Sequence, residues 1–193
     1  TVYKAQQTNT DKTVALKLLG PYISSDEAFL QKLSSAVTTA TTLDHANILS
    51  TISLEFNSEI VWISSEYSAW PTLRHWIKHP IPISQTILIL QQISSAIEYA
   101  KTKGVSHGDI KPGNIFIDSE SGIVKLSDFG LTQASQGVPE SMRTATKIPL
   151  PTYTAPERGY GNSDPSFLSD IYSLGVLAYD MLTGSVPFNA IDR

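Results

Sequence analysis

Residues 107–114 read HGDIKPGN, a polar run that places a carboxylate, an amine and an amide within one short loop. Two further motifs follow along the chain, DFG at 128–130 and APE at 155–157. Each motif alone is common in a loop or turn, and a lone Asp109 could equally cap a helix. The three in this order are far more specific than any one of them. The combination predicts a polar functional site that lies between helices.

The part of the chain before this run has the pattern of a small sheet. Residues 1–7 and 13–19 alternate apolar and polar side chains around a turn at residues 9–11, as two paired strands do. Two more strand-like runs occupy 49–56 and 60–66. Together these runs predict a small antiparallel sheet.

A helix is predicted between the second and third of these strands. Ser24 and Glu27 have the spacing of a helix-capping box, which marks a helix start. The apolar residues that follow recur at helical spacing and form one face. They are Phe29, Leu33, Ala36, Val37, Ala40 and Leu43.

The part of the chain around and after the polar run is mainly helical. Helices are predicted over 84–103 and 166–183, and each is followed by a glycine, which is typical of a helix end. Short β-prone pieces occupy 115–117 and 123–126. The long polar stretch 131–160 has the length of a functional or disordered loop. A strand-rich part followed by a helix-rich part predicts two lobes with a cleft between them.

Taken together, the motifs resemble those of the protein kinase family, in particular the eukaryotic-like Ser/Thr kinases common in bacteria. VALK at 14–17 ends a strand where that family carries a conserved lysine, and the resemblance covers nearly the whole chain. It implies an α+β, two-lobed protein kinase fold that is incomplete at both ends. Residues 1–66 would be a partial N-lobe without the glycine-rich loop, and 67–193 the hinge and a partial C-lobe. The implied activity is transfer of the γ-phosphate of ATP to Ser or Thr hydroxyls of protein substrates, with Mg²⁺ as cofactor.

The resemblance also implies a role for each polar residue of the motifs. Asp109 would be the base that aligns the acceptor hydroxyl and accepts its proton, and Lys111 would offer a cation to the moving phosphoryl group. Asn114 and Asp128 would supply the hard oxygen ligands that magnesium prefers. Lys17 would hold the α- and β-phosphates as a point charge, although taken alone it reads as an exposed strand lysine.

An adenine pocket follows from the same resemblance. Ser65 falls at the gatekeeper position, and Glu66 to Ser68 form the hinge whose backbone groups would meet adenine. The apolar walls of the ATP-binding pocket would be Val2, Ala15 and Phe116. These three residues are read equally well as ordinary core, since pocket walls are also core.

Two further positions are implied to be structural. His107 would pack against Phe129 of the DFG motif. Asp170 would be the buried acid that ties the catalytic loop to a helix of the C-lobe.

Four features depart from the family pattern. Thr1-Val2 corresponds to the end of the family's glycine-rich loop, so the rest of that loop lies upstream of this sequence or is missing, and the helix glutamate that normally pairs with Lys17 falls on Ala36. The arginine expected before the catalytic aspartate is Gly108, so phosphorylation of the activation segment is not expected to be the main switch. The Gly-Thr pair expected shortly before APE is Pro149-Leu150, where the threonine would help to place the substrate hydroxyl.

These departures leave a second function open, that of a pseudokinase or nucleotide-binding scaffold with little or no phosphotransfer. Retention of the whole set of catalytic residues favours the active enzyme. A third function, an interaction domain that binds no nucleotide, is not favoured by the residues.

Composition limits the remaining classes. A net charge of −4 and a pI near 5.5 give no support for a nucleic-acid partner. The absence of cysteine excludes disulfides and thiolate metal sites. No apolar run is long enough to cross a bilayer, so a cytoplasmic location is expected for this piece, while the full-length protein could be anchored outside it. The sequence specifies neither the protein substrate, the regulator nor the oligomeric state.

Overall fold

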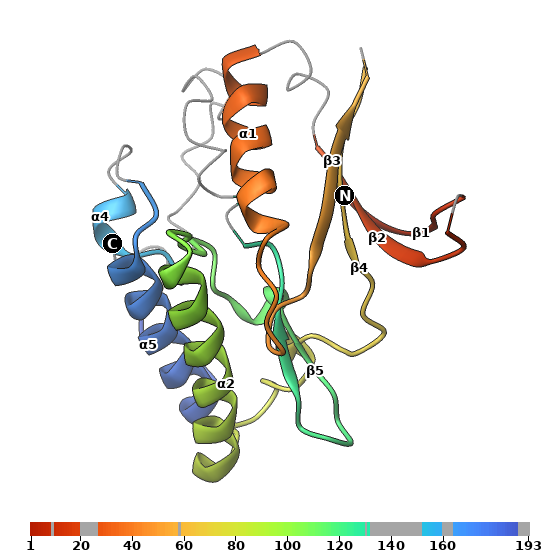
Figure 1. The fold of residues 1–193 in the computed structure, drawn as a ribbon. Helices are drawn as coiled ribbons and strands as arrows, with labels where there is room; N and C mark the ends of the chain where they lie inside the picture. Colours follow the sequence, from red (N-terminus) through yellow and green to blue (C-terminus); the bar gives the residue numbers. More distant parts are fainter. Residues whose placement is uncertain are drawn as a thin grey trace.

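The structure is a computed structural model that describes residues 1–8, 10–19, 27–57, 59–129, 131, 152–159 and 164–188. Figure 1 shows a sheet with one helix at one end of the molecule and a mainly helical part at the other. Some sequence expectations fall outside the described residues. They concern Asn9, Ser24, Gly130, the Pro149-Leu150 pair and most of the polar stretch 131–160.

Four antiparallel strands form the sheet, in the order β1-β2-β4-β3. Their bounds are Val2–Gln6 for β1, Thr13–Leu18 for β2, Thr51–Phe56 for β3 and Val61–Glu66 for β4. The four predicted strands are confirmed, each one a little shorter than expected.

The strand register decides which side chains share a face of the sheet. Lys17 lies opposite both Val2 and Ile63, and Ala15 lies opposite Ser65. Opposed residues lie on the same face, and so do residues two apart along a strand. Val2, Ala15 and Lys17 therefore all project from one face of the sheet.

Helix α1 (Glu27–Ala40) packs against this sheet through its apolar stripe. The upper cluster formed in this way comprises Phe29, Leu33, Val37, Val61 and Ile63. Burying each of these side chains contributes on the order of 1.5–3 kcal/mol. The predicted apolar face is confirmed, except that Leu43 lies beyond the helix end and packs in the lower part of the molecule.

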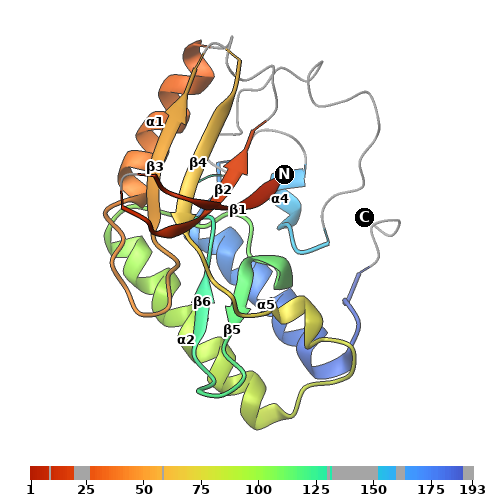
Figure 2. The same ribbon diagram turned by 90° about the vertical axis from the view of Figure 1, so that its right-hand side faces the viewer.

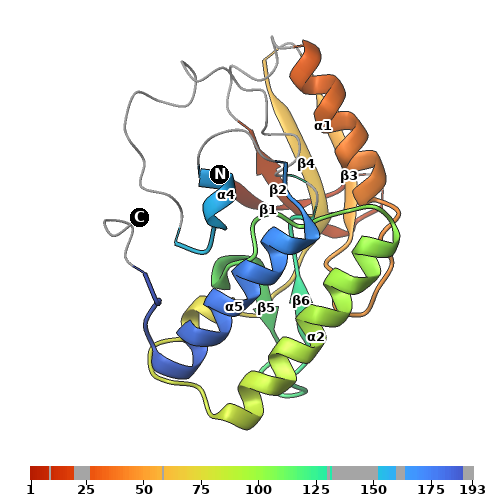
Figure 3. The same cartoon turned by 90° about the vertical axis from the view of Figure 1, so that its left-hand side faces the viewer.

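The lower part is built around α2 and α5, which lie side by side (Figure 3). Its elements are η2 Leu73–His75, α2 Ile83–Thr102, η3 Pro112–Asn114, β5 Ile115–Ile117, β6 Val124–Leu126, α4 Pro156–Gly159 and α5 Phe167–Thr183. The lower cluster includes the fully buried side chains Leu73, Ile93, Ile115, Leu126, Leu177 and Met181. Among the helices described, none combines the length and the apolar character that crossing a membrane requires.

The ends of the two long helices follow from local chemistry. Helix α5 begins with a capping box in which Ser166 and Ser169 each accept the other's backbone N–H, and it ends at Gly184 with φ +73°. Glycine adopts this left-handed conformation without the steric cost of a side chain. Helix α2 begins at Ile83, one residue before the predicted start, because Pro82 takes the N-cap position without a side-chain cap.

The loop between α1 and β3 joins the upper and lower parts of the molecule. The backbone N–H of Leu49 donates to the Leu126 carbonyl at 2.9 Å, and the Leu126 N–H donates to the Asn47 carbonyl at 2.9 Å. The Asn47 side chain adds hydrogen bonds to the Val124 carbonyl at 2.8 Å and to Gln92 at 2.9 Å. Figure 2 shows this loop descending from α1 towards α2 and β6. The loop is thereby held by the lower part of the molecule.

Candidate active site

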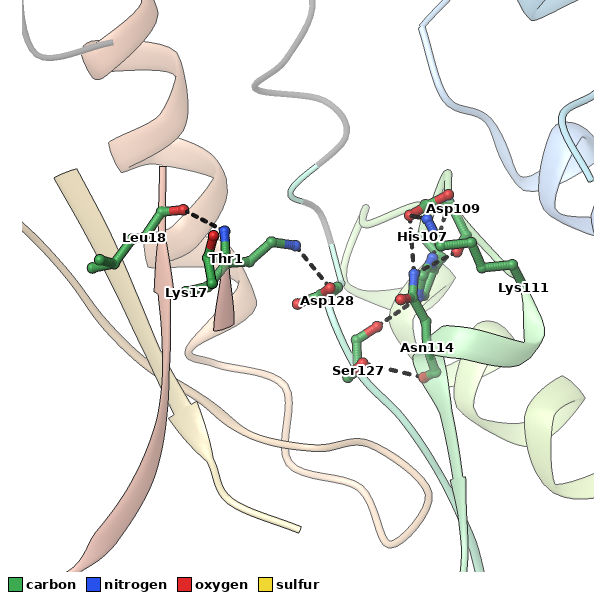
Figure 4. Close-up of polar contacts among 9 residues, drawn as sticks. All are labelled: Thr1, Lys17, Leu18, His107, Asp109, Lys111, Asn114, Ser127 and Asp128. Carbon is green, nitrogen blue, oxygen red and sulfur yellow. Dashed lines mark hydrogen bonds and ion pairs between the residues drawn. The ribbon is translucent and has the colours of Figure 1, made fainter. Parts of the chain in front are cut away.

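The polar residues singled out in the 107–114 run lie together. The Asp109 carboxylate accepts hydrogen bonds from Lys111 Nζ at 2.5 Å and from Asn114 Nδ2 at 3.0 Å (Figure 4). Asn114 Nδ2 also donates to the Asp109 carbonyl at 2.8 Å. The short helix η3 starts at Pro112 and turns the chain back, which brings Asn114 against Asp109. With 36% of its side chain exposed, Asp109 is oriented by its neighbours and still open to solvent.

His107 fixes the backbone beside Asp109. Its Nδ1 accepts the Asp109 N–H at 3.0 Å, so its Nε2 carries the proton and donates to the Ser127 carbonyl at 2.7 Å. Burial lowers the pKa of His107 below its ordinary value, which matches a neutral ring with one donor and one acceptor. The ring also packs edge-on against Phe129, with centroids 4.7 Å apart. The expected contact of His107 with the DFG phenylalanine is confirmed.

Asp170 on α5 holds the same loop from below. Its two carboxylate oxygens accept the backbone N–H groups of His107 at 2.8 Å and Gly108 at 2.7 Å. Burial raises the pKa of Asp170, while the two N–H donors and the charge of Arg158 act in the opposite direction. The predicted role of Asp170 as a tie between helix and loop is confirmed.

Lys17 has an acidic partner, although helix α1 does not supply it. The only carboxylate of α1 is Glu27 at its start, and Ala36 packs against the upper cluster. Lys17 Nζ instead forms an ion pair with Asp128 at 2.8 Å (Figure 4). The orienting contact that the helix glutamate would provide is therefore made by a residue from the DFG motif.

The oxygen donors expected for magnesium lie on adjoining segments. The Ser127 N–H donates to the Asn114 carbonyl at 2.9 Å, and Asp128 is the next residue. The side-chain oxygen of Asn114 and the second carboxylate oxygen of Asp128 accept no hydrogen bond from the part of the chain that the structure describes. These are hard donors of the kind Mg²⁺ takes when substrate phosphates complete its coordination. No group of three or more His, Cys, Asp or Glu side chains among the described residues could hold a metal by itself.

The residues expected around adenine come from both parts of the molecule. Val2 and Ala15 share the sheet face that carries Lys17, and Val2 is 61% exposed. Phe116 sits between two buried isoleucines in β5, so its side chain points away from the lower cluster. Phe116 also forms a β-bridge with Thr72, just after the connection between the two parts. The upper and lower parts of the molecule thus each offer an apolar surface against which the flat adenine ring can pack.

The connection at residues 66–68 is held by side chains that sequence reasoning did not assign. The Glu66 carboxylate pairs with Lys125 at 2.5 Å and accepts the Ser50 N–H at 3.3 Å. The Ser68 hydroxyl accepts the Trp70 N–H at 3.1 Å. The Glu66 N–H also donates to the Ser50 carbonyl at 2.8 Å, so contacts with adenine would fall to the other backbone groups of residues 66–68, as the resemblance implies.

Arg158, directly after the APE motif, is a second residue that sequence reasoning missed. Its Nη1 donates to the carbonyl of Gly108 in the 107–114 loop. Gly108 has φ +78°, a left-handed conformation that favours glycine. No local pattern in the sequence marks this contact, because Gly108 and Arg158 are 50 positions apart.

Comparisons with known proteins agree with this arrangement. The family model described as protein kinase domain matches residues 1–193. The serine/threonine-protein kinase PrkC of Bacillus subtilis is 34% identical over 190 residues, which cover 97% of this chain and 29% of PrkC. The serine/threonine-protein kinase PknL of Mycobacterium tuberculosis is 33% identical over 193 residues, covering 97% of this chain and 47% of PknL. This chain thus spans less than half the length of either relative.

A solved structure gives the same result for the fold. The crystal structure of the Mycobacterium tuberculosis PknI kinase domain is 25% identical, with a TM-score of 0.78. The match covers 98% of this chain and 71% of that structure.

Proposed function

The chain belongs to the protein kinase family, and on this premise we propose that the protein transfers the γ-phosphoryl group of ATP to Ser or Thr hydroxyls of protein substrates. The observation that carries the proposal is the Asp109 carboxylate, held by Lys111 and Asn114 while it stays open to solvent. Relatives that span nearly the whole chain are named Ser/Thr kinases.

Each side chain has a defined task in the proposed reaction. Asp109 accepts a hydrogen bond from the substrate hydroxyl and then its proton. Lys111, already 2.5 Å from Asp109, presents its charge to the phosphoryl group in transfer. Lys17 binds the non-transferred phosphates, and its ion pair with Asp128 sets its direction.

ATP and Mg²⁺ are the usual cosubstrate and metal of this family, and the residues present fit both. The free oxygens of Asn114 and Asp128 would hold magnesium, which neutralises phosphate charge when bound. Val2, Ala15 and Phe116 would enclose adenine, while the backbone of residues 66–68 would read its edge. This assignment is supported by the shared face of Val2 and Ala15 and by the outward position of Phe116.

The proposal also covers the division of the chain into two lobes, its location and its partners. We divide it into an N-lobe at 1–66 and a hinge and C-lobe at 67–193, supported by the separate upper and lower clusters. The division is not strict, since Leu43 packs in the lower cluster and Leu131 packs against the upper one. A cytoplasmic location of this part follows from ATP as the donor, and a nucleic-acid partner is not proposed for a chain of net charge −4.

A nucleotide-binding scaffold without phosphotransfer is the second candidate. The observation in its favour is that Lys17 occupies one oxygen of Asp128, the proposed metal ligand, while Ala36 replaces the usual helix acid. Such a scaffold would bind ATP without turnover.

The two candidates are separated by phosphate transfer from labelled ATP in the full-length protein. The wild-type protein should label itself or a general protein substrate, and Asp109→Asn should lose about a hundredfold in rate or more. Asp44→Asn, which changes an exposed carboxylate in the loop after α1, serves as the matched control and should keep full activity. ATP-dependent thermal stabilisation with no transfer by the wild-type protein would establish the scaffold instead.

A further inference from the structure

We propose that Arg158 is a positioning residue for Asp109: it holds the peptide bond that precedes the catalytic aspartate from outside the catalytic loop. The inference rests on the proposed function, because it concerns the geometry of the base in that reaction. It assigns a role to an arginine that lies after the APE motif and contacts the loop through space.

The peptide bond between Gly108 and Asp109 is fixed at both of its polar ends. Its N–H donates to His107 Nδ1 at 3.0 Å, and its carbonyl accepts from Arg158 Nη1. Rotation of this peptide plane would redirect the Asp109 side chain, since the two share a Cα atom. His107 belongs to the loop itself, so Arg158 is the contact that ties this plane to another element.

Helix α5 supports both the segment that carries Arg158 and the catalytic loop. Asp170 on α5 holds the N–H groups of His107 and Gly108, and Asp180 on the same helix accepts a hydrogen bond from Tyr153 at 2.5 Å. Tyr153 lies a few residues before α4, whose third residue is Arg158. One helix therefore supports the catalytic loop twice, directly through Asp170 and indirectly through the segment that carries Arg158.

The surroundings of the guanidinium explain why it stays beside the loop. Burial lowers the pKa of Arg158, while the charges of Asp170, Asp109 and Glu157 raise it. An arginine keeps its charge at neutral pH, so the half-buried cation is stabilised by these acids. Its Nε is buried and has no hydrogen-bond partner among the described residues, a cost of about 1–3 kcal/mol that other contacts must offset.

Position 108 is a glycine and supplies no cation itself. Its φ of +78° makes any side chain there strained by about 1–2 kcal/mol relative to glycine. The positive charge beside this part of the loop is therefore supplied by Arg158 of α4.

The test uses the full-length protein and compares Arg158→Met, Arg158→Lys and Arg158→Ala with the wild type. Arg158→Met should lower kcat by about ten- to a hundredfold, as expected for a small misplacement of a catalytic group, and leave KM for ATP within about twofold. Arg158→Lys should recover part of kcat. Millimolar guanidinium chloride should raise kcat of Arg158→Ala, and the same concentration of sodium chloride should not. Lys103→Met, at an exposed lysine after α2, is the control and should behave as the wild type.

The outcomes separate this inference from the proposed function. If the wild-type protein transfers no phosphate, both fall. An active wild-type protein whose kcat is unchanged in Arg158→Met overturns the positioning role alone. The positioning role is also overturned if Arg158→Lys has no more activity than Arg158→Met and guanidinium does not restore activity to Arg158→Ala. The arginine would then serve only the fold, and this conclusion does not depend on whether Arg158→Met remains folded.

Discussion

The ion pair between Lys17 and Asp128 permits a quantitative test of the site without any ligand. We consider Lys17→Met, Asp128→Asn and the double variant. At the N–O distance of 2.8 Å, the Coulomb energy of the pair is about 6 kcal/mol at an effective dielectric constant of about 20. The side chains are 34% and 27% exposed, so solvent screening and side-chain ordering leave a net coupling of about 0.5–1 kcal/mol.

The assay is urea unfolding followed by tryptophan fluorescence, since Trp62, Trp70 and Trp76 flank the connection between the two parts. A double-mutant cycle at pH 7 and low salt should give the coupling above, and 1 M sodium chloride should remove most of it. Each single variant should nevertheless lose about a hundredfold or more of phosphate transfer. A coupling of zero at low salt would refute the idea that Asp128 takes the place of a helix acid as the partner of Lys17.

Three other expectations concern the loop and its supports. Burial lowers the pKa of His107, so below about pH 6.5 the unfolded state binds a proton that the folded state does not. The stability of the fold should therefore fall as the pH drops below that value. Urea unfolding midpoints measured between pH 5 and 8 give the slope of stability against pH, and an equal slope in His107→Gln would contradict the prediction. Tyr153→Phe should cost about 1.5–3 kcal/mol in urea unfolding, because Asp180 is buried and loses its donor; a cost below 0.5 kcal/mol would rule out a strong bond. Gly108→Ala should lower stability by about 1 kcal/mol through its positive φ, whereas Ala at position 175, a helical glycine with open space around it, should not.

Much of the fold could be predicted because its signals are local. Alternation along 13–19 and 60–66 indicated strands, and the spacing from Phe29 to Val37 indicated the buried face of α1. The resemblance of the HGDIKPGN run to the kinase family placed Asp109 and Asn114 in one site, and the structure brings them together through the short helix η3.

The missed features are contacts between residues distant in the sequence. The partner of Lys17 is 111 positions away, that of Glu66 is 59 positions away and that of Gly108 is 50 positions away. No periodicity or capping pattern reports such pairs, because they depend on how whole elements pack. The start of α2 at Ile83 was missed for a different reason, since proline can cap a helix without a side-chain donor or acceptor.

The hydrogen bonds of the loop after α1 have a mechanical consequence. With Asn47 and Leu49 fixed to β6, the end of α1 at Ala40 works as a pivot and the helix as a lever about 20 Å long. Any swing of α1 then displaces Glu27 most and Ala40 least. A partner protein that presses near Glu27 would therefore shift the helix more than one that presses near Ala40.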